Sequence, residues 1–408
     1  MTATIDLVFG ADALAPPLTG IGRYSFELAQ RLEQDPSIAS VRYFSLGHWL
    51  DAPLQALQQA SGQAPANPPS EGAAAAGPPA PLLARARARL ARNPAAVRAY
   101  RLLMPPLQRW RLRHCGNALF HAPNFFVPPF PGKTVATVHD LSHLRHPQFH
   151  PPARVQYMNA ALPPSLRRTD HVIVISEATR QEFLHFFPWF ASERISVTPL
   201  AADPAFHPHS DAQWRAALGT ATGLPRLRMR GYTLYVGTVE PRKNLDRLLH
   251  AYARLPEALR REYPLLIVGS QGWHSQHTHA VMRNAQAQGW LHYLSFAPQA
   301  WLPALYAGAA LFLYPSLYEG FGLPVVEAMA SGTPVITSSA SSMPEVAGDA
   351  AWLVDPMDEE ALGHAITQAL QDTAWQQAAR QAGLHRAAGF SWDRCTQQTV
   401  QIYQRVCN

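Results

Sequence analysis

The pattern that most constrains this chain is an alternation of short apolar segments with loops and helix-like segments, which occurs twice along the sequence. Such alternation is typical of a mostly parallel sheet covered by helices. The sequence therefore predicts two α/β domains of Rossmann type in series. The predicted strands are Ile5–Phe9, Val41–Leu46, Thr134–Val138 and His171–Ile175 in the first set, and Tyr232–Val236, Leu265–Val268, Tyr293–Phe296, Leu311–Tyr314 and Val335–Thr337 in the second.

The stretch Ala202–Met229, which is polar and contains several prolines, separates the two sets. The chain has 408 residues, enough for two domains of ordinary size, and its hydrophobic content of 47% is sufficient for two cores. The longest apolar run, Ala304–Tyr314, is too short to span a bilayer. The first thirty residues contain Asp6 and Asp12 and no basic residue before Arg23, which does not resemble a signal peptide.

The cysteines indicate the redox compartment of the protein, and the distribution of charge indicates the kind of partner it could bind. Three cysteines lack Cys-x-x-Cys spacing, which argues against a disulfide framework or a zinc site and fits a reducing cytosol: Cys115, Cys395 and Cys407. The net charge is +6. The segment 81–114 contains nine arginines and no acidic residue: Arg85, Arg87, Arg89, Arg92, Arg98, Arg101, Arg109, Arg111 and Arg113.

The arginine-rich segment also carries apolar residues at helical spacing: Leu102, Leu103, Met104, Leu107 and Trp110. Two interpretations stay open. The segment is suited to lie on an anionic membrane surface, or it is a solvated helical face. Nucleic acid would be attracted by the same charge, but the sequence contains no recognition motif for it, so we expect no nucleic-acid partner.

In the second set, a cationic pair follows a predicted strand. The segment GTVEPRKN, residues 237–244, comes directly after Tyr232–Val236. Ligands of open parallel sheets bind at the carboxyl ends of the strands, and Gly237 permits close approach to the backbone. Arg242 and Lys243 match a diphosphate in charge. Because cations at a helix N-terminus oppose the helix dipole, their presence predicts an anion between them.

Two glutamates bracket a further loop, in the sequence YEGFGLPVVE. Leu311–Tyr314 predicts a buried strand before it, and Pro324 suits the first turn of a helix that ends near Ser331. The N-terminus of that helix offers backbone N–H groups to an anion. Glu319 and Glu327 would repel phosphate but accept hydrogen bonds from hydroxyl groups. The sequence therefore predicts a ligand with both phosphate and polyol groups.

Candidate residues follow strands of the first set as well. Gly20 and Gly22, in TGIGRY, predict a glycine loop after the first strand, and Ser25 stands where a dinucleotide-binding fingerprint needs its third glycine. The dehydrogenase motif is therefore absent. His139 directly follows Thr134–Val138, where it is placed to donate a hydrogen bond to a sugar or phosphate oxygen, although a lone histidine is also common in structural positions.

Together these segments resemble glycosyltransferase family 4, a retaining family. The resemblance rests on TGIGRY, VHDL, GTVEPRKN, EGFGLPVVE with seven residues between the glutamates, and SGTPVITSSASSMPEVAGDAAWLVDP, in that order. It covers nearly the whole chain except His48–Gly116. It implies an α/β protein with the GT-B fold, in which two Rossmann-like domains face each other across a cleft.

The resemblance also implies the domain limits. The final stretch FSWDRCTQQTVQIYQRV resembles the helix that crosses back to the first domain in GT-B enzymes. We therefore expect an acceptor-binding domain of residues 1–203 plus 391–408 and a nucleotide-sugar-binding domain of residues 204–390.

The family's donor-binding residues can be placed on the second domain one by one. Arg242 and Lys243 match the pair that binds the donor diphosphate, beside Gly237 at the strand end. Glu319 matches the acid that reads the hydroxyls of the transferred sugar, and Glu327 matches the acid that holds the nucleotide ribose. The resemblance thus assigns the cationic pair to the diphosphate and each of the two glutamates to a different sugar of the donor.

The remaining positions concern backbone amides and the first domain. The amides that cradle sugar and phosphate in the family fall on Phe321, Gly322 and Leu323. His139 matches the histidine beside the reacting sugar, and Gly20 with Gly22 matches the loop over the phosphates. Some relatives carry an arginine where this chain has Thr238, so the resemblance supports a clamp of two cations rather than three.

The resemblance implies transfer of a hexose from a nucleoside diphosphate sugar to a saccharide acceptor. The segments GTVEPRKN, YPSLYEGFGLP and SSASSMPEVAGDAA are similar to bacterial mannosyltransferases of O-antigen and exopolysaccharide assembly, which favours GDP-mannose over GDP-rhamnose and UDP-glucose, and a lipid-linked acceptor. We expect no metal and no other cofactor, since no Asp-x-Asp motif occurs in a suitable loop. A cytoplasmic protein, peripheral on the inner face of the plasma membrane, is expected.

Other functions share parts of this pattern. A GT-B nucleotide-sugar epimerase and a non-catalytic sugar-nucleotide binding protein would have the same architecture and similar motifs. A phosphorylase would need a cofactor-bearing lysine, and the chain's lysines are Lys133 and Lys243, so this alternative is disfavoured.

Overall fold

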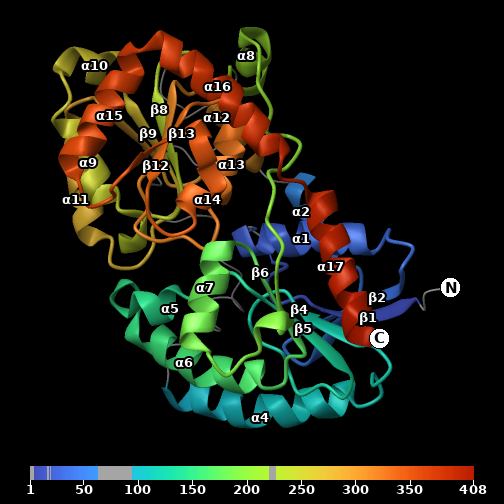
Figure 1. The fold of residues 1–408 in the computed structure, drawn as a ribbon. Helices are drawn as coiled ribbons and strands as arrows, with labels where there is room; N and C mark the ends of the chain where they lie inside the picture. Colours follow the sequence, from blue (N-terminus) through green and yellow to red (C-terminus); the bar gives the residue numbers. More distant parts are fainter. Residues whose placement is uncertain (1–3, 16–17, 19, 63–93, 220–226) are drawn as a thin grey trace. The chain divides into compact units, whose positions relative to one another are not determined.

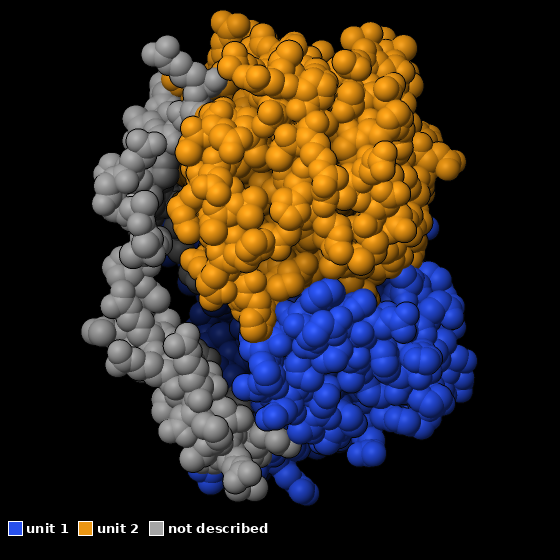
Figure 2. Space-filling view, turned by 90° about the vertical axis from the view of Figure 1, so that its left-hand side faces the viewer, with its two compact units in different colours: residues 1–64, 78–200, 392–408 blue, residues 65–77, 201–391 orange. Residues whose placement is uncertain are grey.

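The computed structural model describes residues 4–15, 18, 20–62, 94–219 and 227–408. The described residues divide into two compact units, which are coloured separately in Figure 2. Unit 1 contains those up to Leu200 together with Trp392–Asn408, and unit 2 contains Ala201–Ser391. The C-terminal helix therefore belongs to the same unit as the N-terminal strand.

In the described part of unit 1, seven strands form one sheet in the order β3-β2-β1-β4-β5-β6-β7. β3 runs antiparallel to β2, and the other neighbours are parallel. The strands are β1 (Ile5–Gly10), β2 (Ile38–Ser45), β3 (His48–Leu50), β4 (Leu119–Ala122), β5 (Lys133–Val138), β6 (His171–Val174) and β7 (Ile195–Val197). The α-helices are α1 (Gly20–Leu32), α2 (Pro53–Gly62), α4 (Pro94–Leu112), α5 (Ser142–Arg145), α6 (Pro152–Leu166), α7 (Glu177–Phe186) and α17 (Trp392–Cys407).

The core of unit 1 lies on both faces of this sheet. α6 and α7 contribute Leu162 and Phe183 to a cluster with Val138 and Val174 of β5 and β6. The end of α4 contributes Leu112 to a second cluster, which includes residues of β1 and β4. α17 packs against α1, β5 and β6, as can be followed in Figure 1. None of the helices in the described ranges combines the length and the hydropathy needed to cross a membrane.

In the described part of unit 2, six strands form a fully parallel sheet in the order β10-β9-β8-β11-β12-β13. The strands are β8 (Thr233–Val236), β9 (Leu265–Val268), β10 (Leu291–Leu294), β11 (Leu311–Tyr314), β12 (Val335–Ser338) and β13 (Ala351–Val354). The α-helices are α8 (Asp211–Leu218), α9 (Leu245–Ala253), α10 (Glu257–Glu262), α11 (Gln276–Ala287), α12 (Leu302–Ala307), α13 (Leu323–Ala330), α14 (Met343–Ala347), α15 (Glu359–Gln371) and α16 (Thr373–Ala388).

Helices cover both faces of the second sheet, as Figure 1 shows. α9, α11 and α15 pack together on one face, and α12, α13, α14 and α16 on the other. Because both faces are covered, β9, β11 and β12 are buried at every residue, and β9 and β11 are almost continuously apolar. The strand order reverses between β8 and β11, and ligands of such sheets bind outside the carboxyl ends of the strands at this reversal.

The structure confirms an α/β chain with two sheets, one mostly and one fully parallel, and differs from the sequence prediction in detail. β3, β4, β7 and β13 were not predicted. β4 is short, with a histidine in the sequence LFHA, so it lacks the continuous apolar pattern of its neighbours. β10 ends at Leu294, two residues before the predicted end. The segment without a family motif, 48–116, contains β3, α2 and α4 among its described residues.

Gly269 provides a test of the close packing at the end of β9. A Cβ at this position would lie 1.9 Å from the carbonyl oxygen of Gly237, the residue that follows β8. We expect Gly269→Ala to lower the free energy of unfolding by about 1–3 kcal/mol, measured by denaturant titration. Gly363→Ala in α15 is the matched control, since its Cβ would come no closer than 3.6 Å to any atom. Equal stability of the two variants would contradict this packing.

Candidate active site

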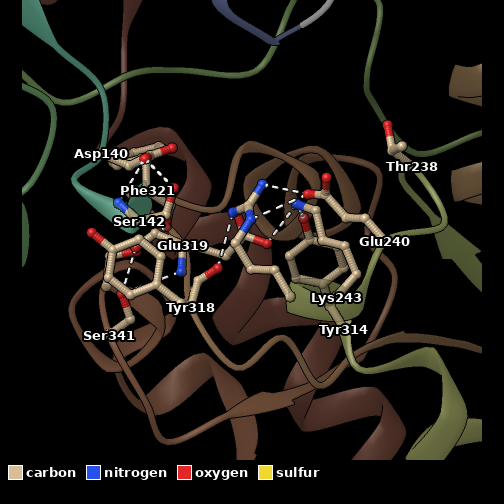
Figure 3. A network of polar contacts seen from close by, with 12 residues as sticks. Asp140, Ser142, Thr238, Glu240, Lys243, Tyr314, Tyr318, Glu319, Phe321 and Ser341 are labelled. Carbon is tan, nitrogen blue, oxygen red and sulfur yellow. Dashed lines mark hydrogen bonds and ion pairs between the residues drawn. The ribbon is translucent and has the colours of Figure 1, made fainter. Parts of the chain in front are cut away.

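The candidate site of unit 2 is built on an ion triad at the reversal of the strand order. Arg242 and Lys243 lie in a short 3-10 turn after β8, and Glu319 lies in the loop after β11. The Arg242 Nη1 atom is 2.7 Å from Glu319 Oε2, and the Lys243 Nζ atom is 2.5 Å from Glu319 Oε1. Figure 3 shows Lys243 and Glu319 pointing toward one another. The anion predicted between the two cations is therefore, in this structure, the carboxylate of Glu319.

Two residues that the sequence prediction missed complete the surroundings of the triad. Glu240 accepts hydrogen bonds from the Arg242 guanidinium, with its Oε1 atom 2.8 Å from Nη2. The Lys243 ammonium donates to the Tyr314 hydroxyl at 2.7 Å and lies 5.1 Å from the centre of the Tyr314 ring. Both residues stand inside quoted motifs, Glu240 in GTVEPRKN and Tyr314 at the start of YPSLYEGFGLP. Their spacing alone does not indicate that they meet the cations.

The charges of the triad depend on one another because Lys243 and Glu319 are buried. Burial raises the pKa of Glu319, but the charges of Arg242 and Lys243 outweigh it and lower that pKa to about 2. Burial and the charge of Arg242 lower the pKa of Lys243, while Glu319 and Glu240 oppose this change. Glu319 is thus ionised near neutral pH, and a further anion beside Lys243 would stabilise its charged form.

Serine hydroxyls hold the loop that carries Glu319. The Ser342 hydroxyl donates to the carbonyl oxygens of Glu319 and Phe321, both at 2.9 Å. The Ser341 hydroxyl accepts from the Glu319 N–H and donates to its carbonyl, and both residues are labelled in Figure 3. Neither serine was predicted as a site residue. The loop backbone is therefore fixed before any ligand binds.

The loop ends at the N-terminus of α13, where the backbone conformation requires glycine. Gly322 has a φ of 106° and precedes the helix directly. A Cβ there would also lie 2.2 Å from the Met343 side chain. The predicted amides of Phe321, Gly322 and Leu323 thus lie at a helix N-terminus, which favours an anion. The helix begins one residue before the predicted start at Pro324.

Glu327 and the residues after β8 occupy separate positions in unit 2. Glu327 lies in the second turn of α13, and its Oε2 atom accepts a hydrogen bond from the Tyr306 hydroxyl at 2.9 Å. Gly237 lies at the end of β8, where its N–H donates to Val268 of β9. Thr238 lies apart from the triad in Figure 3. The structure therefore brings Arg242, Lys243 and Glu319 into direct contact and leaves Glu327 with a different partner.

In unit 1, His139 is the first residue after β5 and is buried. Its Nε2 atom lies 2.7 Å from the Pro123 carbonyl oxygen. A carbonyl only accepts, so Nε2 carries the proton. Burial lowers the pKa of His139, although the Pro123 carbonyl opposes this change, so the ring is neutral near pH 7 and Nδ1 holds a lone pair. The predicted donor function is thus already used by Pro123, and Nδ1 is the ring's acceptor.

Gly20 and Gly22 lie in the first turn of α1 rather than in a loop before it. The sequence predicted a glycine loop at these two positions, but the helix already begins at Gly20. A Cβ at Gly22 would lie 2.9 Å from the carbonyl oxygen of Ala13, whereas one at Gly20 would meet no atom within 4 Å among the described residues beyond its neighbours in the sequence. Gly22 therefore permits a close approach of two backbone segments, and Gly20 is the first residue of α1.

These positions allow a definite chemistry. Unit 2 combines two cations and a helix N-terminus, which can stabilise negative charge as it develops on a leaving group. The carboxylates of Glu319 and Glu327 can accept hydrogen bonds from hydroxyl groups. In unit 1, described by itself, the neutral imidazole of His139 can accept a hydrogen bond at Nδ1.

Comparison with known proteins assigns both halves of the chain. The family model described as Glycosyltransferase Family 4 matches residues 18–206, and the one described as Glycosyl transferases group 1 matches residues 226–386. The chain is 38% identical over 400 residues to O-antigen chain mannosyltransferase B of Escherichia coli, covering 98% of this chain and 100% of that protein. It is 31% identical over 246 residues to the MMP alpha-(1->4)-mannosyltransferase of Mycolicibacterium hassiacum, covering 59% of this chain and 55% of that protein.

Solved structures share the fold at low sequence identity. WaaG, a glycosyltransferase involved in lipopolysaccharide biosynthesis, matches with a TM-score of 0.68 and 16% identity, covering 97% of this chain and 99% of its own. Anabaena Alr3699/HepE in complex with UDP and glucose matches with a TM-score of 0.66 and 17% identity, covering 98% of this chain and 100% of its own. With the full-length relative and the two family matches, these likenesses establish that the chain belongs to glycosyltransferase family 4 and has the GT-B fold.

Proposed function

We propose that this chain transfers mannose from GDP-mannose to a saccharide acceptor, with retention of configuration, in the assembly of a surface polysaccharide. The observation that carries the proposal is the likeness to O-antigen chain mannosyltransferase B, which is 38% identical and extends over 100% of that protein. A second mannosyltransferase, the MMP alpha-(1->4)-mannosyltransferase, is 31% identical over a shorter range. The contacts of the ion triad support a donor that carries both a diphosphate and a sugar.

In this proposal, the triad residues exchange partners when the donor binds. Arg242 and Lys243 contact the diphosphate, which replaces Glu319 as their counter-ion. Glu319 then accepts hydrogen bonds from hydroxyls of the mannose. The diphosphate also receives hydrogen bonds from the amides of Phe321, Gly322 and Leu323, close to Gly237, and Glu327 accepts from the ribose. The burial of Lys243 and Glu319 supports this exchange. A buried charge has lost its hydration and requires a counter-ion, whereas an exposed charge is stabilised by water.

Residues of unit 1 are proposed to act on the sugar and the phosphates. The lone pair on Nδ1 of His139 accepts a hydrogen bond from a mannose hydroxyl. The first turn of α1, with Gly20 and Gly22, offers N–H groups to the diphosphate. The neutral state of His139 supports its assignment to the sugar, and the place of both glycines in the first turn of α1 supports theirs to the diphosphate.

The transfer step balances without a protein base. The bond between the mannose anomeric carbon and the diphosphate oxygen breaks, and a bond forms from that carbon to an acceptor hydroxyl on the same face of the sugar. The acceptor proton passes to the departing diphosphate oxygen. Arg242, Lys243 and the N-terminus of α13 stabilise the charge that develops on the diphosphate. We propose that these groups make a metal ion unnecessary.

We further propose a lipid-linked acceptor, reached at a membrane surface by α4. Leu103 and Trp110 are two helical turns apart and expose 67% and 55% of their surface. The guanidinium groups of Arg111 and Arg113 lie 5.3 and 4.7 Å from the centre of the Trp110 ring. Exposed apolar side chains beside cations suit the interface of an anionic bilayer. Arg85, Arg87, Arg89 and Arg92 lie outside the described residues.

A panel of donors tests the proposed reaction. We expect GDP-mannose to bind more tightly than GDP-rhamnose or UDP-glucose in calorimetric titrations, and mannose to appear in an α-linkage on a synthetic acceptor, as read by proton NMR of the anomeric signal. Release of an epimerised sugar nucleotide would favour the epimerase alternative. Binding of donor without turnover on any acceptor would favour a sugar-nucleotide binding protein.

Glu319→Gln tests the exchange of counter-ions. The substitution keeps the shape of the side chain but removes the carboxylate charge that competes with the diphosphate. Since a charge-assisted hydrogen bond is worth about 1.5–3 kcal/mol, we expect GDP to bind at least about threefold more tightly than to wild type. We also expect a lower melting temperature without ligand, because two buried cations lose their partner, and a larger increase on adding GDP.

The matched control for this substitution is Glu257→Gln in α10. Glu257 forms an exposed ion pair with Arg261, with atoms 2.5 Å apart, and such a pair contributes little to stability. We expect its GDP affinity and melting temperature to equal those of wild type. Weaker GDP binding by Glu319→Gln than by this control would show that Glu319 does not compete with the diphosphate.

Removal of divalent metals tests whether protein groups alone can neutralise the charge of the departing diphosphate. If Arg242, Lys243 and the α13 N-terminus neutralise the departing diphosphate, transfer measured in EDTA should stay close to the rate in untreated buffer. Complete loss of transfer in EDTA, followed by recovery on adding magnesium or manganese, would overturn the metal-free reaction.

Vesicle sedimentation tests the membrane surface of α4. We expect wild type to bind anionic but not zwitterionic vesicles at low salt, and binding to weaken as salt screens the attraction. The combined substitution of Arg109, Arg111 and Arg113 by glutamine should abolish binding while GDP affinity is retained. Trp110→Ala should weaken binding, whereas Trp189→Ala, which removes an exposed tryptophan beside Arg167, is the matched control. Equal sedimentation of all variants would rule out α4 as the contact.

A further inference from the structure

A buried chain of hydrogen bonds in unit 1 connects the C-terminal helix to the strand that precedes His139. The Tyr403 hydroxyl of α17 lies 2.5 Å from Nδ1 of His121 in β4. The Nε2 atom of His121 lies 2.8 Å from the Thr137 hydroxyl in β5, which lies 2.9 Å from the Tyr24 hydroxyl of α1. All four side chains are fully buried. The chain thus joins four elements that are far apart in the sequence.

All members of this chain are neutral near pH 7. Burial raises the pKa of Tyr24 and of Tyr403 well above that of a free phenol. Burial, with a smaller contribution from His139, lowers the pKa of His121 to about 3. The chain therefore holds no charge that a ligand could neutralise. Its physical effect is to fix orientations, because a buried polar group left without a partner is costly.

The Tyr24 end of the chain packs directly on His139. The two rings are 5.0 Å apart between centres, at an angle of 81°. Phe125 contacts His139 from another direction, with ring centres 6.1 Å apart, and the Pro123 carbonyl binds Nε2. Two aromatic rings and one hydrogen bond therefore determine the orientation of the imidazole and the direction of its lone pair.

The C-terminal helix contacts this arrangement at both of its ends. Trp392, the first residue of α17, lies against Tyr24, with ring centres 6.3 Å apart. Tyr403, three turns later, reaches Tyr24 through His121 and Thr137. Tyr24 is also on α1, four residues after Gly20 and two after Gly22. Through Tyr24, α17 is thus connected to His139 and to the first turn of α1, which carries Gly20 and Gly22.

We propose that Tyr24, Thr137, His121 and Tyr403 are positioning residues for the transfer step, through which α17 holds His139 in its reactive orientation. The proposal rests on the proposed function of His139 toward the sugar. It predicts that damage to this hydrogen-bond chain slows turnover without weakening GDP binding, because its residues belong to unit 1 and the ion triad belongs to unit 2.

A double-mutant cycle with His139→Ala tests this coupling. We expect Tyr24→Leu, which removes the ring beside His139, to lower kcat about tenfold, since small misplacements of a reacting group have effects of this size. Tyr24→Phe and Tyr403→Phe, which keep the rings, should lower kcat less. The Kd for GDP, which lacks the mannose that His139 is proposed to contact, should not change. In the His139→Ala background the same substitutions should have no further effect on kcat.

The matched control is Tyr43→Phe. Tyr43 is a buried tyrosine of unit 1 whose hydroxyl donates a hydrogen bond to Glu33 at 2.7 Å. Glu33 is not one of the four residues of the hydrogen-bond chain. We expect its kcat to equal that of wild type even if its melting temperature falls. Equal losses of kcat in the wild-type and His139→Ala backgrounds would overturn the proposal, because the residues would then act independently of His139.

Nitrogen-15 NMR of the imidazole gives a readout that does not require activity. Wild type should show His139 in a single tautomer protonated at Nε2, and Tyr24→Leu should broaden or divide this signal. An unchanged signal in folded Tyr24→Leu would also contradict the proposal. If wild type transfers no mannose, the proposed function fails, whereas the NMR result still decides whether the chain orients His139.

Discussion

The contact between Glu319 and the pair Arg242 and Lys243 is the interaction on which the site of unit 2 depends. Two adjacent cations, one of them buried, would repel each other and would be poorly solvated without a counter-ion. The Glu319 carboxylate, within 2.5 to 2.7 Å of both, removes this difficulty. A diphosphate carries more negative charge than one carboxylate, which is why we propose that it replaces Glu319 as the partner of these cations.

The parallel sheet makes this contact possible. β8 and β11 are neighbours although they are far apart in the sequence, and the order reverses between them. The loops that follow them therefore leave the sheet at the same edge and meet there. Gly269 and Gly322 serve the same arrangement: one allows two strand ends to approach closely, and the other allows the backbone to enter α13. The chemistry of the site is thus set largely by backbone geometry.

The sequence predicted the elements that carry continuous apolar segments and the residues that belong to motifs. Leu311–Tyr314 and Leu265–Val268 match β11 and β9 residue for residue. The contact of Lys243 with Glu319 joins residues 76 positions apart, and motif spacing does not state which strands are neighbours. For the same reason Glu240 and Tyr314 were not predicted as partners of the cations. In unit 1, the hydrogen bond from His139 to Pro123 reverses the expected donor function, and only the fold brings these residues together.

The measurement that tests the account most directly is mannose transfer from GDP-mannose by wild type and two lysine variants. Lys243→Ala should lower the transfer rate at least about tenfold, since a charge-assisted contact to developing diphosphate charge is worth about 1.5–3 kcal/mol. Lys133→Ala, at the chain's other lysine, which is exposed at the start of β5, should match wild type. A folded Lys243→Ala variant with the wild-type rate would contradict the assignment of the ion triad to the donor diphosphate.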